Sequence, residues 1–158
     1  MSFFDYPSEV PATPVTGPVD VLLADASEAD WATLLAHTQT RRFDPGEVIV
    51  TDGEVDRSLY LVLEGELAVM ASRGRRGYRK IAVVGAGSVI GELAFFDGGA
   101  RSALVRAATP AVLAEMSPGS FDALAVASPA LARQLLFDLG RILARRLRAA
   151  QAAAPGGN

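Results

Sequence analysis

The residues best suited to chemistry lie in one short stretch that begins at Gly91 and includes Glu92 and Arg101. The sequence predicts a short helix starting at Gly91, and the first backbone N–H groups of such a helix have no partner within it and can receive an anion. Arg101 can neutralise the same anion through forked, charge-assisted hydrogen bonds. Glu92 beside an anion is useful only when the ligand also offers a hydroxyl. A ribose 2′-OH next to a cyclic phosphate meets both requirements.

The composition of the 158-residue chain argues against several other kinds of site. It has no cysteine, which excludes disulfides, thiolate metal sites and thiol catalysis. Its single histidine, His37, supplies too few nitrogen ligands for an ordinary zinc or iron centre. His37 also lies outside the predicted strands, which argues against a metal-binding cupin. We therefore expect a one-domain binding protein with no metal or cofactor, and not an enzyme.

Charge is distributed unevenly along the chain, which has a formal net charge of −3. Residues 1–66 contain thirteen acids and three bases, or −10, whereas residues 67–158 contain five acids and twelve bases, or +7. The basic residues gather in two groups, Arg73, Arg75, Arg76, Arg79 and Lys80, and then Arg141, Arg145, Arg146 and Arg148. Such groups are typical of solvated turns and helix faces, although they also suit an anionic partner. Because the whole chain is not a polycation, we expect no DNA binding.

The sequence contains neither a membrane-spanning pattern nor an export signal. No apolar run approaches the roughly 20 residues that span a bilayer. The amino terminus lacks the basic segment and apolar core of a signal peptide. We therefore expect no membrane span and a cytoplasmic location.

Short β-rich runs separated by Gly, Asp and Pro dominate residues 41–117. The predicted strands are 48–51, 59–63, 66–71, 81–84, 102–107 and 111–116. No helix-length segment separates them, so the pattern favours a jelly roll over alternating βαβ units. Before these runs, Ser27 and Asp30 predict the start of a helix that continues through Leu34. Residues 1–19, with four prolines, are predicted to be an extended tail.

The last part of the domain predicts two helices, a short one around 121–126 and a long one from Pro129 to about Gln151. Ser128 and Pro129 are typical of an N-cap followed by proline at the first helical position. The apolar residues of the long helix form one broad stripe: Leu131, Leu135, Leu136, Leu139, Ile142, Leu143 and Leu147. This stripe must be covered by the strands or by a second copy. Gly140 weakens the helix by about 1 kcal/mol relative to Ala unless close packing explains it.

The expected fold is therefore mainly β with flanking helices. One domain over residues 20–151 would contain an antiparallel jelly-roll β-barrel at about 41–117, with one helix before it. A hinge helix and a long helix would follow at about 118–151. Residues 152–158 are predicted to be a disordered tail.

A second glycine-rich pattern overlaps the candidate site. The apolar run that starts at Ile81 leads into Gly85, Gly87 and Gly91, which suggests a dinucleotide-dependent oxidoreductase. The spacing is GxGxxxG and not GxGxxG, and Asp97-Gly98-Gly99 interrupts the following helix within two turns. A Rossmann unit also needs a second parallel strand and an acid about 20 residues further on. We therefore regard this alternative as weak.

The candidate stretch, Ile90-Gly91-Glu92-Leu93 and then Arg101-Ser102-Ala103, resembles the phosphate-binding cassette of cyclic-nucleotide-binding domains. It is most similar to the catabolite activator protein branch of that family. Phe43–Ile49 resembles the opening strand and turn of the family, and Leu59–Glu66 resembles its central hairpin. The resemblance covers about residues 21–151.

The resemblance implies which residues bind the ligand and what the main ones do. Glu92 would bind the ribose 2′-OH of cyclic AMP or cyclic GMP, and Arg101 would bind the cyclic phosphate. The activator branch recognises adenine with hydroxyl residues at the end of the long helix, where this chain has Ala150 and Gln151. Gln151 can hydrogen-bond a purine edge and Ala150 cannot, so the identity of the base is left open. The predicted ligand-binding residues are Gly91, Glu92, Leu93, Ala94, Arg101, Ser102, Ala103 and Gln151.

On this resemblance the chain is expected to be a stand-alone regulatory module that senses a cyclic nucleotide. Leu93, Phe95 and Phe96 would relay ligand binding to the hinge at about 117–129 and so move the long helix. The chain ends at Asn158 without the helix-turn-helix domain of the activator branch. We therefore expect its output to pass through an unidentified protein effector, or through a homodimer formed by the long helix.

The alternative hypothesis is a degenerate barrel that binds no nucleotide and serves as a protein-interaction or dimerisation module. In such a barrel Glu92 and Arg101 would form an internal salt bridge. This arrangement is less favourable, because a buried ion pair without a ligand is a weak stabiliser.

Overall fold

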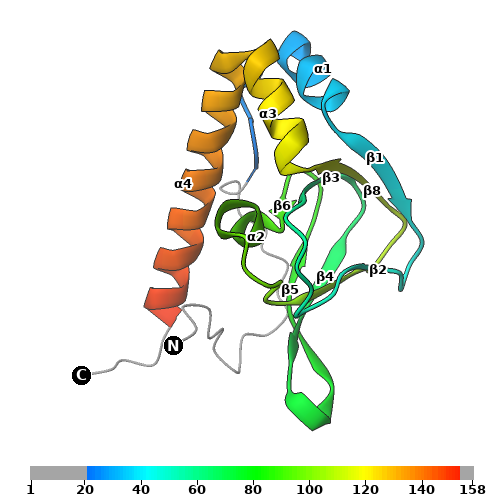
Figure 1. Cartoon of the computed structure of the whole chain (residues 1–158). Helices are drawn as coiled ribbons and strands as arrows, with labels where there is room; N and C mark the ends of the chain where they lie inside the picture. The colour runs from blue at the N-terminus through cyan, green and yellow to red at the C-terminus, as the bar shows by residue number, and fades with distance from the viewer. Residues whose placement is uncertain (1–20, 154–158) are drawn as a thin grey trace.

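Two antiparallel sheets form the centre of the molecule. This computed structural model describes residues 21–153, and within that range eight strands form two four-stranded sheets. The first sheet contains, in spatial order, β1 (Gln39–Phe43), β8 (Ala111–Met116), β3 (Leu59–Glu64) and β6 (Val89–Ile90). The second contains β2 (Val48–Val50), β7 (Leu104–Ala107), β4 (Leu67–Ser72) and β5 (Tyr78–Val84). The predicted jelly-roll-like fold with flanking helices is confirmed, as two packed sheets and not one closed barrel (Figure 1).

Strand β3 is buried on both faces, which explains its uninterrupted apolar sequence. Side chains alternate between the two faces of a strand. Tyr60 and Val62 pack between the sheets, in a cluster that includes Leu67 of the second sheet. Leu59 and Leu61 lie on the other face and belong to a second cluster, which the helices complete. The strand therefore joins the two halves of the core.

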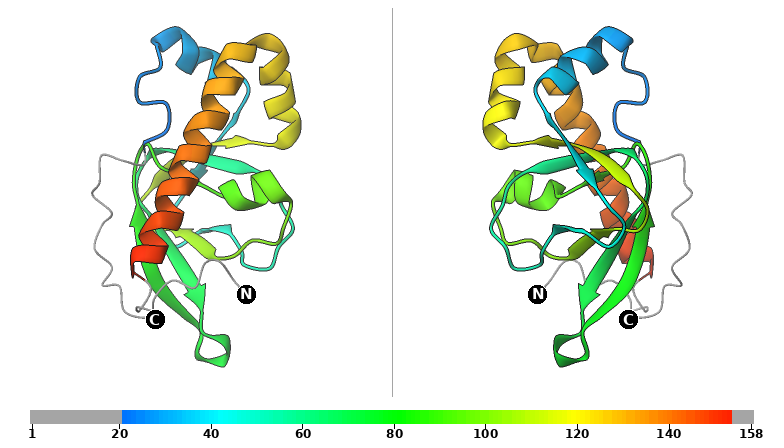
Figure 2. Two further views of the ribbon diagram at one scale, coloured as in Figure 1. Left: turned by 90° about the vertical axis from the view of Figure 1, so that its left-hand side faces the viewer. Right: turned by 90° about the vertical axis from the view of Figure 1, so that its right-hand side faces the viewer.

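Four helices complete the second cluster: α1 (Glu28–Ala36), α2 (Glu92–Asp97, through Phe95), α3 (Pro118–Ala127) and α4 (Pro129–Ala153). The long α4 runs down one side of the strands, as both views in Figure 2 show. Its residues Leu131, Leu135, Leu139 and Ile142 are almost completely buried. Each such side chain contributes about 1.5–3 kcal/mol when it leaves water. This row holds α4 in its place against the first sheet.

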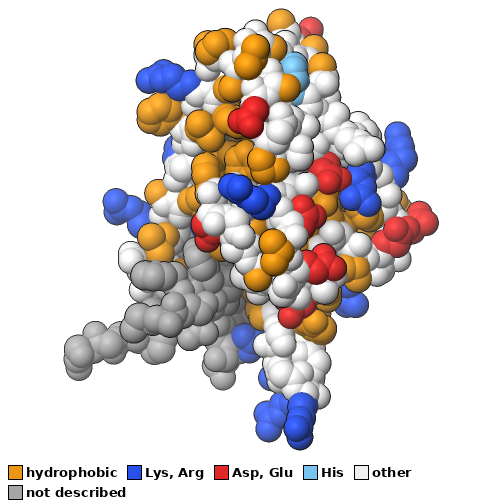
Figure 3. All heavy atoms as spheres, in the orientation of Figure 1, with side chains coloured by type: hydrophobic (Ala, Val, Ile, Leu, Met, Phe, Trp, Pro, Cys, Tyr) orange, Lys and Arg blue, Asp and Glu red, His pale blue; other side chains and the backbone are white. Residues whose placement is uncertain are grey.

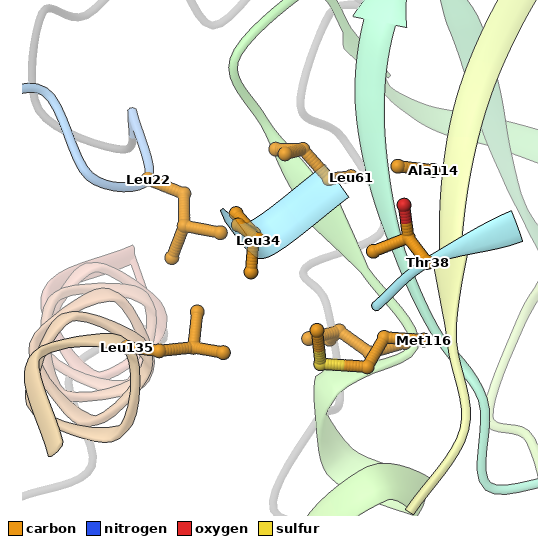
Figure 4. A pocket seen from close by; sticks show the side chains of 8 residues that line it. Leu22, Leu34, Thr38, Leu61, Ala114, Met116 and Leu135 are labelled. Carbon is orange, nitrogen blue, oxygen red and sulfur yellow. The ribbon is translucent and has the colours of Figure 1, made fainter. Parts of the chain in front are cut away.

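Figure 4 shows an apolar hollow in this core, where Leu34, Leu61, Met116 and Leu135 converge. Its volume is about 10 Å³. A space of that size holds at most about one water molecule. The hollow is therefore part of the packed core and has no room for a ligand.

The segment before α1 ties α4 to the strands. Leu22 and Leu23 are each only 1% exposed. The backbone N–H of Leu22 donates to the carbonyl of Gly87 at 3.0 Å. The backbone N–H of Leu23 donates to Oδ2 of Asp138, on α4, at 2.8 Å. The chain between residues 21 and 26 therefore connects the turn before β6 with the middle of the long helix.

Most elements lie where the sequence predicts them, and the differences have simple causes. The Ser27 hydroxyl accepts from the backbone N–H of Asp30, as predicted for the start of α1. The sequence pattern does not predict β1, in which only Phe43 is buried, or the two-residue β6. Helix α4 continues to Ala153, so the tail predicted at 152–158 begins two residues too early. Residues 152 and 153 are both alanine, a strong helix former, which explains why the helix continues. The predicted tail at 1–19 lies outside the described residues.

Two other expectations bear on the function. The glycine-rich stretch at 85–91 contains the antiparallel β6 and leads into the six-residue helix α2 (Glu92–Asp97). This arrangement contradicts the dinucleotide-binding alternative, which requires a parallel sheet and a longer helix.

Between residues 21 and 153, no helix is both long and apolar enough to cross a bilayer.

Candidate functional site

Gly91 connects β6 to α2 in a backbone conformation that favours glycine. Its φ and ψ are 80° and 12°, in the left-handed region, and it is the N-cap residue of α2. A Cβ atom at this position would lie 2.6 Å from Nη1 of Arg101 and 2.8 Å from the carbonyl oxygen of Ser58. Gly91 therefore permits both the turn and the close approach of the arginine.

Arg101 is the buried cation of the site, with 5% of its surface exposed. Its Nη1 donates to the carbonyl of Gly91 at 3.1 Å, and its Nη2 donates to the carbonyl of Ser58 at 2.7 Å. Oδ2 of Asp56 lies 3.7 Å from Nη2. A guanidinium has five N–H donors, so these two hydrogen bonds fix its orientation and leave donors for a bound anion.

The three residues before β3 organise both ends of α2. Ser58, besides accepting from Arg101, donates its backbone N–H to Oδ1 of Asp56 at 2.9 Å. That hydrogen bond, with a smaller contribution from Arg101, lowers the pKa of Asp56 below its ordinary value. Arg57 donates to the carbonyls of Ala94 and Phe95 at 3.4 and 3.0 Å, near the C-terminal end of α2.

Glu92 makes an ion pair with α4. Nη1 of Arg146 donates to Oε1 of Glu92 at 2.7 Å, and Nη2 of Arg146 donates to the carbonyl of Val89 at 3.0 Å. The side chains of Glu92 and Arg146 are 12% and 22% exposed. The alternative hypothesis of a Glu92–Arg101 salt bridge is therefore wrong. Each of the two residues has a different partner, because α4 brings its own cation to the start of α2.

The structure brings together some of the predicted site residues and not others. Gly91, Glu92 and Arg101 lie around the start of α2, as the contacts above show. Leu93 and Ala103 are half-buried, Ala94 is buried, and Ser102 is exposed. Gln151 is exposed on the last turn of α4, and within residues 21–153 no hydrogen bond joins it to the 91–103 stretch.

Three polar residues that contact the site are not among the predicted site residues: Asp56, Arg57 and Arg146. A signal for Arg146 was present in the sequence. The buried residues of α4 follow helical spacing at 131, 135, 139 and 142, and Arg146 is the next position of that row. A cation that continues an apolar row must find a partner, since an unpaired charge there is costly. Asp56 and Arg57 have no comparable signal.

Comparison with known proteins agrees with this geometry. The profile of the family described as cyclic nucleotide-binding domain matches residues 40–128. The chain is 32% identical over 131 residues to glutaminase 2 of Bradyrhizobium diazoefficiens, covering 83% of this chain and 20% of that protein. It is 32% identical over 123 residues to the cyclic AMP receptor protein of Thermus thermophilus, covering 78% of this chain and 54% of that protein. The chain thus spans about half the length, or less, of these curated relatives.

A similar structure has also been solved. A cyclic nucleotide-binding domain from Methylobacillus flagellatus superposes with a TM-score of 0.75 at 29% sequence identity. The match covers 87% of this chain and 79% of that one. The likeness therefore includes the flanking helices as well as the two sheets.

Proposed function

Because the chain belongs to the cyclic nucleotide-binding domain family, we propose that it binds a cyclic nucleoside monophosphate at the start of α2 and acts as a regulatory module. The observation that carries the proposal is the buried guanidinium of Arg101, held against Gly91 with donors left over. The cyclic phosphate, a monoanion, would accept from Arg101 and from the first backbone N–H groups after Gly91.

Glu92 would receive the ribose. Its Oε1 accepts from Arg146, which leaves the second carboxylate oxygen for the 2′-OH of the sugar. Linear nucleotides carry an extra phosphate charge and lack the closed ring, so we expect them to bind more weakly. Cyclic AMP and cyclic GMP share the sugar and the phosphate, and Gln151 is the proposed contact for the base.

The same contacts would couple the ligand to α4. Arg146 joins α4 to Glu92, so a sugar bound at Glu92 changes the partners of this ion pair. A second connection runs through Phe95 of α2, whose ring meets Phe121 of α3 edge to face at 5.8 Å. A ligand shifts the equilibrium between two positions of the helices only by as much as its affinity for the two positions differs. We propose that the module signals through this shift of α3 and α4, without making or breaking a covalent bond.

The exposed side of α4 is the proposed output surface. Leu136 is 39% exposed and Leu147 is 36% exposed, and with Gly140 and Leu143 they follow an alternating spacing of three and four residues. This is the spacing of a helix seam that packs against another helix. A Cβ atom on Gly140 would meet nothing within 4 Å, so this chain alone does not explain the glycine. A second copy, approaching closely at Gly140, would explain it, and we propose a homodimer through α4.

The binding proposal is tested by isothermal titration calorimetry with cyclic AMP, cyclic GMP and linear AMP. Arg101→Ala should weaken binding of the preferred cyclic nucleotide by about 10- to 150-fold, the effect of one lost charge-assisted hydrogen bond of about 1.5–3 kcal/mol. Arg106→Ala is the matched control, because Arg106 is an exposed arginine on the neighbouring β7. Equal binding by the wild type and Arg101→Ala would overturn the assignment of the phosphate site. No binding of either cyclic nucleotide to the wild type would overturn the proposed ligand.

A further inference from the structure

The ribbon formed by β4 and β5 is the most basic part of the chain. Between Glu66 and Glu92 the sequence contains no Asp or Glu. The same interval contains five basic residues within eight positions: Arg73, Arg75, Arg76, Arg79 and Lys80. The proposed cyclic-nucleotide site does not use any of them. This local charge of +5 occurs in a chain whose net charge is −3.

The end of the ribbon extends beyond the sheet. Strand β7 pairs with β4 only from Leu67 to Met70. Beyond Met70, Ala71 and Ser72 pair only with Arg79 and Tyr78 of β5. The result is a two-stranded ribbon that projects from the molecule, at the lower end of Figure 1. In Figure 3 basic side chains gather at the tip of this projection.

The tip is open and has a defined conformation. Arg73, Arg75 and Arg76 are exposed, and the last two lie in a short 3-10 turn at 74–76. Added Cβ atoms on Gly74 and Gly77 would meet nothing within 4 Å. The backbone N–H of Arg73 donates to the carbonyl of Gly77 at 2.6 Å and closes the turn. Since the turn is already formed, a partner would not have to order it.

A side-chain contact also ties the projecting part of the ribbon to the turn after β2. The hydroxyl of Tyr78 donates to Oδ1 of Asp52 at 2.7 Å. Tyr78 is the one large apolar side chain of the ribbon that is exposed, and its polar end is already occupied by this contact. Membrane-binding surfaces combine basic residues with apolar groups that enter the lipid. The ribbon tip has the charge for such a surface but not the apolar groups.

We infer that the tip of the β4–β5 ribbon, residues 73–80, is a docking site for the phosphate backbone of a nucleic acid duplex. A duplex carries about one negative charge per 1.7 Å along its axis, so the cations of the turn and of β5 can meet several phosphates together. An acidic peptide would need carboxylates at matching positions. A two-stranded ribbon is also narrow enough to enter the major groove of B-DNA, which is about 12 Å wide. Arginine forks suit phosphate oxygens, and Gly74 and Gly77 let the backbone approach closely.

This inference revises the expectation of no DNA binding, which rests on the net charge of the whole chain and on the lack of a recognition helix. Charges in water act over about 10 Å at ordinary salt, so Asp52 beside Tyr78 offsets one charge of the ribbon but the acids of a distant face do not cancel the rest. Phosphate contacts need no recognition helix, because they position a protein without reading the sequence. The inferred binding is therefore independent of base sequence and strongly dependent on salt.

The test is fluorescence anisotropy of the full chain with a short labelled DNA duplex at a series of salt concentrations. The double variant Arg75→Gln/Arg76→Gln should weaken binding about tenfold and lower the slope of log affinity against log salt by about 1.8, or 0.9 for each lost phosphate contact. The matched control is Arg42→Gln/Arg148→Gln, which removes the same charge from exposed positions outside the ribbon. This control should bind nearly as the wild type does. Circular dichroism and urea unfolding report whether each variant keeps its fold.

Three results would overturn the inference. The first is an absence of duplex binding by the wild type at low salt. The second is an equal loss of affinity in the ribbon variant and in the control, which would mean that only total charge matters. The third is tighter binding to polyglutamate, or to vesicles of phosphatidylserine and phosphatidylcholine, than to the duplex. Since the cyclic nucleotide is measured separately, these results leave the proposed function untouched, and its failure leaves this inference untouched.

Discussion

Replacing Gly91 by alanine tests whether the glycine positions Arg101 or only allows a turn. Helix α2 provides an unusual internal control, because a glycine stands at each end in nearly the same conformation. Gly91 has φ 80° and ψ 12°, and Gly98 has φ 70° and ψ 10°. An alanine costs about 1–2 kcal/mol in this left-handed region at either position. The two substitutions therefore share the same backbone penalty.

The two sites differ in what the new methyl group meets. At Gly98 the nearest atom is Nε of Arg57 at 3.5 Å, an ordinary contact. At Gly91 the methyl would lie 2.6 Å from Nη1 of Arg101 and 2.8 Å from the carbonyl of Ser58. Arg101 would have to move, which would break its hydrogen bond to residue 91. Overpacking of this kind adds about 1–3 kcal/mol, so Gly91→Ala should destabilise the chain by about 2–5 kcal/mol and Gly98→Ala by about 1–2.

Urea unfolding of both variants, followed by circular dichroism, measures these losses. Calorimetry with the cyclic nucleotide should then show that Gly91→Ala weakens binding at least about tenfold, the equivalent of 1.4 kcal/mol, while Gly98→Ala changes it much less. Equal destabilisation by the two alanines would refute the argument, because the close contacts with Arg101 would then have no energetic consequence. Unchanged ligand affinity in a folded Gly91→Ala would refute the positioning role.

Three further predictions concern the surroundings of the site. Arg57→Gln removes the cation from the C-terminal end of α2 and should lower the free energy of unfolding in urea by about 0.3–1 kcal/mol. Calorimetry should also show weaker nucleotide binding. If neither the stability nor the affinity changes, α2 does not need this contact. The folded chain holds the pKa of Asp56 below its ordinary value of 3.8, so this carboxylate stabilises the fold above about pH 4 and loses that effect as acid protonates it. Asp56→Asn should therefore flatten the fall of stability below pH 4, and an identical pH profile would contradict the role of the Ser58 hydrogen bond. Leu136→Glu should give a monomer in sedimentation velocity, whereas Val126→Glu, at a position 85% exposed on α3, should not; dimers that persist in Leu136→Glu would exclude the α4 seam.

The fold was largely predictable because its strongest signals are local. The run Leu59–Leu63 is apolar throughout, and the structure gives it a sheet on one side and helices on the other. Strand β1 is different, since four of its five residues are exposed and only Phe43 is buried. Its pairing with β8 along its whole length holds it in place. That pairing is a tertiary contact, and the sequence of β1 alone carries no period that reveals it.

The candidate site also has a part that local sequence predicts and a part that depends on tertiary contacts. Gly91, Glu92 and Arg101 lie within eleven residues of one another, so their spacing alone predicts an anion site. The partners that orient them come from far away in the chain: Ser58 is 43 residues from Arg101, and Arg146 is 54 residues from Glu92. No local pattern predicts which distant residue reaches which atom. The less favourable alternative drawn from the sequence paired Glu92 with Arg101, whereas the structure has two separate pairs.

The most direct test of the central claim is a ¹H–¹⁵N NMR titration of the wild-type chain with cyclic AMP and cyclic GMP. The account predicts saturable shifts with one ligand per chain, largest at the backbone amides of residues 91–94 and at Nε of Arg101. Smaller shifts should follow along α4 near Arg146. Saturable shifts confined to another part of the molecule, or no saturable shift with either nucleotide, would contradict it.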